Sequence, residues 1–253
     1  MTLHGRLGGL LCLAAGLAAP GISAPAQQLS RDQLTALVAR GTESRPADLR
    51  EKDLSGLDLS GFDFKAADLS NARFLKTNLR GADLAGTNMF GANLSGADLT
   101  GADLSRANLD VAVAHDTRFT KARLPGASLY AMIMDGADFS GADLSGARII
   151  AFAKGANFSA ANLANVDMGA DPGNQPMGVM RSNFEGANLQ NAVLTNANLS
   201  KADLTRADLT GADLTGADLA GVNLTQTVLR SVKGRAQAKN FDKALNADKA
   251  ITK

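Results

Sequence analysis

Residues that could carry out catalysis are scarce in this chain of 253 residues. It contains two histidines and one cysteine, with His4 and Cys12 near the N-terminus and His115 in the middle. A Ser-His-Asp relay would therefore depend on His115 and its neighbour Asp116 alone, and the chain lacks the residues for a His/Cys metal cluster. The sequence also has no glycine-rich phosphate loop and no metal-binding motif. These observations predict a non-enzymatic protein with no catalytic residues, no cofactor and no metal site.

Carboxylates are abundant, but their spacing indicates an architectural role. The stretch Ala97-Asp98-Leu99-Thr100-Gly101 is followed directly by Ala102-Asp103-Leu104-Ser105-Arg106, and the pattern Ala-(Asp/Asn)-Leu-x-x continues along most of the chain. We call the Leu position the centre of each unit. Centres recur every five residues over residues 49–149, 158–168 and 184–229. This internal repeat is the feature from which the fold must be predicted.

A period of five fits neither an α-helix, whose apolar residues recur about every 3.6 positions, nor an ordinary strand with its period of two. It fits a chain that turns once per unit, so that four units form a coil of about twenty residues. Leu at the centre and Ala two residues earlier then point inward, whereas the Asp or Asn between them points outward. Successive coils would stack about 4.8 Å apart and pair their backbone N–H and C=O groups.

The tandem Ala-(Asp/Asn)-Leu-x-x units resemble those of the pentapeptide-repeat proteins over residues 47–231. This resemblance implies an all-β fold, a right-handed four-sided (quadrilateral) β-helix solenoid. Gly56, Gly61 and Gly81 stand at the last position of their units, where a tight corner disfavours a bulky side chain. Because one fold supports many functions, the resemblance implies the architecture and leaves the role open.

The N-terminal end of the solenoid is expected to carry a short capping helix, because an open end exposes apolar coil faces. Residues 27–46 contain the capping-box pattern Ser30-Arg31-Asp32-Gln33. This pattern predicts a helix with Leu34, Leu37 and Val38 on one side.

The C-terminal end is expected to carry a second short helix within residues 232–253, with Phe241 and Leu245 facing inward. Two roles are open for it. The helix caps the column and presents a basic surface, or it forms a homodimer through residues 240–253, as the family resemblance allows.

The first 26 residues predict an export signal. Arg6 supplies a positive charge, residues 7–19 form an apolar stretch, and Ala24-Pro25-Ala26 offers the small residues that signal peptidase requires. Cleavage after Ala26 would give a periplasmic or secreted protein without cysteine. The remaining chain has no second apolar stretch long enough to cross a membrane.

The repeat is interrupted twice, at residues 150–155 and at residues 169–181. The second interruption contains two prolines and three glycines and predicts a loop, which is either functional or a tolerated insertion. A milder irregularity is Ala114, which occupies a centre position and would underfill the core.

Large apolar residues occupy outward positions near the first interruption. With a coil of about twenty residues, one outward column on successive coils holds Phe90, Asp110, Tyr130 and Ile150, and a neighbouring face begins beside it. We predict that these residues form an exposed protein-interaction patch, unless one of the two irregular segments folds back over it. The patch comprises Phe90, Val111, Val113, Tyr130, Ile133, Ile150 and Phe152.

Two functions follow from these features. The first is an exported non-enzymatic scaffold that mediates protein–protein interaction with an unknown protein partner. The alternative, taken from the resemblance, is a DNA-mimicking protein of the quinolone-protection type that binds a topoisomerase (gyrase). Residues 47–231 hold 21 acidic and 16 basic residues, whereas residues 232–253 are basic. This charge density is far below that of duplex DNA, and no stretch is basic enough to predict nucleic acid as a partner.

Overall fold

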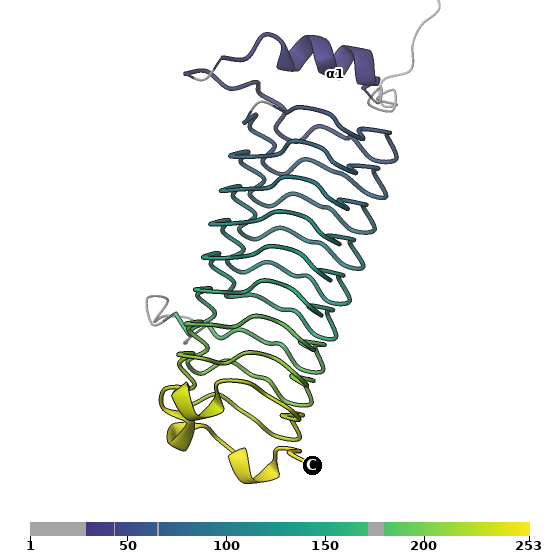
Figure 1. Ribbon diagram of the computed structural model, residues 1–253. Helices are drawn as coiled ribbons and strands as arrows, with labels where there is room; N and C mark the ends of the chain where they lie inside the picture. The colour runs from purple at the N-terminus through teal and green to yellow at the C-terminus, as the bar shows by residue number, and fades with distance from the viewer. Residues whose placement is uncertain (1–28, 43, 65, 172–179) are drawn as a thin grey trace, which may run out of the picture.

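The computed structural model describes residues 29–42, 44–64, 66–171 and 180–253. The chain forms an elongated column of stacked coils, with a helix across the N-terminal end and the C-terminus at the other end (Figure 1). The predicted export signal, residues 1–26, lies outside the described residues. No helix in the described part of the chain is long and apolar enough to cross a membrane.

Stacking between coils follows a register of twenty residues. Asp63 pairs in parallel with Asp83, and Asp83 pairs in the same way with Asp103. The hydrogen bonds are short, as between the N–H of Leu69 and the carbonyl oxygen of Asn88 at 2.7 Å. Each pairing is an isolated bridge, and the described residues contain no continuous strand. The repeat therefore builds a β-type solenoid in which every unit contributes one bridging residue.

Corners recur at the last residue of each unit. Gly101 has a φ of 69° and lies in the left-handed region, where glycine carries no steric penalty. Residues with side chains also adopt this conformation, among them Asn71 at 57° and Val111 at 62°. Because such a turn returns every five residues, each twenty-residue coil changes direction four times.

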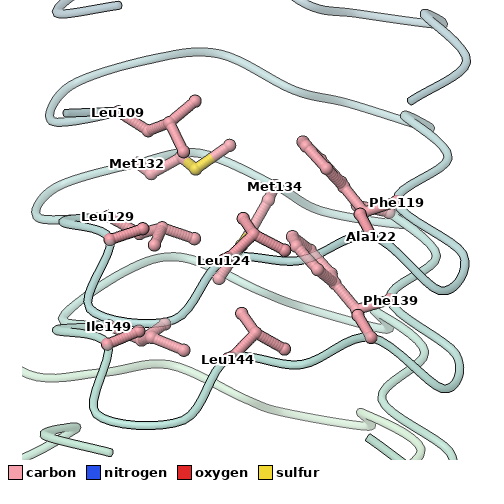
Figure 2. Close-up of a cluster of buried hydrophobic side chains, with 14 of the residues drawn as sticks. Leu109, Phe119, Ala122, Leu124, Leu129, Met132, Met134, Phe139, Leu144 and Ile149 are labelled. Carbon is pink, nitrogen blue, oxygen red and sulfur yellow. The ribbon is translucent and has the colours of Figure 1, made fainter. Parts of the chain in front are cut away.

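The interior is a continuous apolar column. Leu109, Leu129 and Ile149 are fully buried on successive coils, and the rings of Phe119 and Phe139 lie parallel beside them (Figure 2). The two ring centroids are 4.4 Å apart, and Phe158 continues the stack 4.9 Å further on. Burial of these side chains contributes about 0.8 kcal/mol per CH₂ group and is the main stabilising term.

Ala114 was expected to underfill this column. It is fully buried, and the next centre along the same coil is Phe119. The same order recurs where Ala153 is followed by Phe158. A large centre next to a small one keeps the total side-chain volume of a layer closer to that of two Leu residues.

Helix α1 (Arg31–Val38) covers the first coil. The hydroxyl of Ser30 accepts the N–H of Gln33 at 3.2 Å, and the side chain of Gln33 accepts the N–H of Ser30 at 2.8 Å. Leu34 and Val38 are buried against the core. Arg31 donates hydrogen bonds to the carbonyl oxygens of Asp58 and Ser60, which fixes the helix to the second half of that coil.

The C-terminal segment differs from the expected helix. It contains three single-turn 3-10 helices, η2 (Arg235–Gln237), η3 (Phe241–Lys243) and η4 (Ala247–Lys249), separated by extended residues. Lys239, Leu245 and Ile251 each form a parallel bridge to the preceding coil. A continuous helix would remove these extended bridging residues, so the segment forms a last coil with a period of six. Leu245 is 53% exposed and does not face inward as expected.

Candidate protein-interaction surface

Three apolar residues stack on successive coils at the position that the repeat normally gives to Asp or Asn. Val113 forms a parallel bridge to Ile133, and Ile133 forms a parallel bridge to Phe152. Phe152 is 43% exposed, and the other two side chains are half-buried. We call Val113, Ile133 and Phe152 the apolar row. Among the bridging residues that the structure describes, this is the run in which three consecutive coils all present an apolar side chain.

The adjoining corner widens this row. The N–H of Gly91 donates to the carbonyl oxygen of Asp110, and the N–H of Val111 donates to that of Tyr130, so these corner residues belong to successive coils. Phe90 and Val111 are each 45% exposed, and Tyr130 is half-buried. Asp110 lies between Phe90 and Tyr130 in this stack. We call Phe90, Val111 and Tyr130 together with the apolar row the apolar surface; its residues come from four coils.

Ile150 was expected in this patch, but it is buried, with 1% of its side chain exposed. The segment between the centres Ile149 and Ala153 is one residue shorter than a regular unit, and it has no residue in the left-handed region. In this shortened segment Ile150 and Ala151 both lie inside. The shortened unit also brings Phe152 into register with Ile133, nineteen residues earlier.

Apolar residues at these positions remove a local hydrogen bond, which the structure replaces from the neighbouring coil. In a regular unit the Asp or Asn side chain accepts the N–H two residues later, as Asn93 does from Ser95 at 3.0 Å. Phe152 cannot do this, and the N–H of Lys154 donates instead to the carboxylate of Asp135 at 2.8 Å. The surface therefore gains its apolar character without leaving this N–H unpaired.

A cation links the apolar surface to the second interruption. The guanidinium of Arg148 lies 4.4 Å from the ring centroid of Tyr130 and forms an ion pair with Asp171 at 2.9 Å. Asp171 forms an antiparallel bridge to Met180, which closes the base of the predicted loop. The remainder of that loop, residues 172–179, lies outside the described residues. The prediction that this loop folds back over the patch therefore also falls outside them.

A shallow groove continues the surface toward the C-terminus. It has a volume of about 300 Å³ and runs between the exposed side chains of Phe152 and Leu245. Arg181 and Lys201 lie along it, and Asp203 is part of its lining. The sequence interpretation missed Leu245, although the six-residue spacing of Lys239, Leu245 and Ile251 was available as a signal. It also missed Val193, an exposed residue at a bridging position of another side.

The carboxylates of the regular units serve their own turns. The hydroxyl and the N–H of Thr215 hold the pKa of Asp213 below its ordinary value, and Ser55 does the same for Asp53. The described residues contain no group of three or more His, Cys, Asp or Glu side chains placed to hold a metal ion. His115 is exposed on the turn that follows Val113.

Comparison with known proteins matches the repeat to a single family model. The model described as pentapeptide repeats matches eight copies, over residues 47–86, 87–124, 115–149, 180–216 and 207–233. No curated protein sequence matches the chain.

The chain is also similar to solved structures of pentapeptide repeat proteins. The crystal structure of HetL, a pentapeptide repeat protein involved in heterocyst differentiation regulation from the cyanobacterium Nostoc sp. strain PCC 7120, is 31% identical, with a TM-score of 0.53. The match covers 80% of this chain and 98% of HetL. Full-length QnrB1, a plasmid-mediated fluoroquinolone resistance protein, is 17% identical over 79% of this chain and 93% of its own, with a TM-score of 0.33. A pentapeptide repeat protein of the Arabidopsis thaliana thylakoid lumen is 28% identical over 55% of this chain and 70% of its own, with a TM-score of 0.22.

Proposed function

Because the chain belongs to the pentapeptide-repeat family, we propose that it is an exported, non-enzymatic scaffold that binds another protein chain through its apolar surface. The apolar row carries this proposal. In a regular unit the bridging position holds Asp or Asn, which satisfies the following N–H, so an apolar residue there gains nothing for the coil. Three in succession form an exposed patch of the kind that marks protein-interaction sites.

The architecture suits a binding role. A twenty-residue register with a corner every five residues supports a four-sided coil, and membership of the family supports the right-handed winding. Each side of such a coil presents one side chain per layer on a rigid backbone. A rigid surface loses little conformational freedom on binding, and this favours association.

Similarity to HetL supports binding as the mode of action. HetL is described as involved in the regulation of heterocyst differentiation, and its match to this chain extends over almost its whole length.

Export is the second part of the proposal and is supported by the sequence of residues 1–26. Fractionation of cells that produce the full-length protein is expected to place it in the periplasm or the medium. N-terminal sequencing is expected to find a chain that begins at Gln27. A cytoplasmic protein that retains Met1 would refute export and would leave the binding surface untouched.

Binding through the apolar surface is tested by affinity capture from the fraction that contains the protein. Tyr130→Ser together with Ile133→Ser is expected to abolish capture of any partner. Val193→Ser is the matched control, because Val193 is an exposed apolar residue of similar accessibility, at 39%, on a different side of the coil. Equal capture by the wild type and the double variant would refute the proposed surface.

A further inference from the structure

The row that contains the apolar residues is nearly self-complementary about Ile133. From the N-terminal coils onward, the parallel bridges connect the following residues in order: Asp53, Arg73, Asn93, Val113, Ile133, Phe152, Asn183, Asp203, Asn223 and Leu245. Leu245, at the C-terminal end of the row, has no counterpart before Asp53 among the described bridges. Counted outward from Ile133, Val113 corresponds to Phe152, Asn93 to Asn183, and Arg73 to Asp203. Apolar residues therefore correspond to apolar ones, amide to amide, and a cation to an anion.

We propose that the partner of this surface is a second copy of the chain, packed antiparallel about a two-fold axis at Ile133. This inference rests on the proposed function and names the occupant of the same surface. A two-fold interface requires one patch to match itself, because every contact between two residues occurs twice. The order of residues along this row meets that requirement.

The spacing of the row keeps the match in register. Neighbouring bridging residues are about 4.8 Å apart, so the nine residues from Asp53 to Asn223 span about 38 Å. Two copies of the same solenoid have identical spacing. Side chains that interdigitate at Ile133 therefore still face their counterparts three coils away, at Arg73 and Asp203. A partner of a different fold would drift out of register over this length.

The cation of the row is accessible to a partner. The side chain of Arg73 is 56% exposed. Its present ion pair with Asp53, at 3.7 Å, is a surface pair, which contributes little. In the dimer Arg73 can gain a second carboxylate, that of Asp203 in the other copy.

A two-fold at Arg123, on another side of the coil, lacks this symmetry. That row has Asp103 on one side and Asp143 on the other, so the two carboxylates would face each other. Facing carboxylates repel, and this disfavours pairing about Arg123. An axis at Ile133 is therefore favoured over one at Arg123.

The test measures self-association of the purified full-length, processed protein by sedimentation equilibrium. Wild-type protein is expected to dimerise, and Ile133→Asp is expected to weaken the dimer by about tenfold or more, because it places two carboxylates at the axis. Asp is the usual residue of the repeat at this position, so the variant retains the fold. Val193→Asp makes the same change on another side and is expected to leave the dimer constant unchanged.

A charge exchange tests the antiparallel register. Arg73→Asp and Asp203→Arg are each expected to weaken the dimer, and the double variant is expected to restore it. Cysteine cross-linking gives an independent readout, since the chain after residue 26 contains no cysteine. With a short bismaleimide, Ile133→Cys is expected to link to itself. Asn93→Cys should link to Asn183→Cys but not to itself, because two Asn93 residues would lie about 19 Å apart along the axis.

Three outcomes would overturn the dimer. The first is a wild type that is monomeric up to its solubility limit. The second is a dimer that Ile133→Asp does not weaken, as expected for contact through residues 240–253. The third is cross-linking of Asn93→Cys to itself. Capture of a different protein that is lost in Tyr130→Ser with Ile133→Ser would keep the proposed function while the dimer fails. Absence of both interactions would refute both.

Discussion

The carboxylate of Asp110 accepts the backbone N–H of Tyr130 on the next coil at 2.9 Å. It also accepts the hydroxyl of Ser128. Ser128 occupies a bridging position where Asp or Asn would normally accept the N–H of Tyr130. Asp110 supplies the missing acceptor from one coil away, as Asp135 does for Lys154. Carboxylates outside the regular acidic position thus repair units whose own acceptor has been lost.

Asp110→Ala is therefore expected to destabilise the protein by about 1–2 kcal/mol, because hydrogen bonds to a charged group are lost and the N–H of Tyr130 is left unpaired. Urea unfolding followed by circular dichroism measures the change. Glu51→Gln removes a corner carboxylate and is the control, with an expected change below about 0.5 kcal/mol. Equal midpoints for Asp110→Ala and the wild type would contradict the repair role.

Val111 is expected to strain the corner that it occupies, because a β-branched residue at a φ of 62° is sterically unfavourable. Val111→Gly should raise the free energy of unfolding by about 0.5–1 kcal/mol. This is the net of the strain that is relieved and the conformational entropy that glycine adds to the unfolded chain. Gly101→Val is the reverse experiment. A Cβ atom at Gly101 would meet no other atom within 4 Å, so only the φ of 69° opposes the substitution. A loss of about 1–2 kcal/mol in Gly101→Val would isolate the cost of φ itself.

Ala114→Leu tests whether the core layer is already filled. If Phe119 occupies the volume that Ala114 leaves, the added side chain overpacks the coil and costs about 1–3 kcal/mol. Combining it with Phe119→Leu should recover most of that loss, because total volume is nearly conserved. A gain in thermal midpoint for Ala114→Leu alone would instead show that the layer is underfilled.

Stability is expected to fall in acid because the folded state holds several carboxyl pKa values low. The pKa of Asp213 is lowered by its hydrogen bonds from Thr215. A depressed folded-state pKa gives stability that is present above the unfolded pKa, near 4, and lost as the pH falls through the folded pKa. Unfolding free energies should thus be level near neutrality and decrease below about pH 4.

Thr215→Val tests the origin of this acid sensitivity. The substitution removes the hydroxyl donor, so the pKa of Asp213 in the folded state should rise toward its ordinary value. The variant is expected to be less stable at pH 7 and to lose less stability between pH 7 and pH 3. An unchanged pH profile would assign the acid sensitivity to other carboxylates.

Most of the solenoid could be predicted from local pattern. A coil of about twenty residues is what the five-residue unit predicts, and the bridges that connect Asp63, Asp83 and Asp103 confirm that register. The C-terminal coil could not be predicted from the same period, because its bridging residues Lys239, Leu245 and Ile251 are six apart. The extra residue in each unit is taken up by a 3-10 turn, which the five-residue pattern does not contain.

The amino-acid sequence by itself determined the repeating coil, because inward Leu and Ala, an outward Asp or Asn and a corner are properties of each five-residue unit. The tertiary structure decided which outward side chains become neighbours. That outcome depends on register across coils, where one residue fewer after Ile149 buries Ile150 and aligns Phe152 with Ile133. The missing residue changes the register from twenty to nineteen for the bridges that span it, and this places Phe152 in the apolar row.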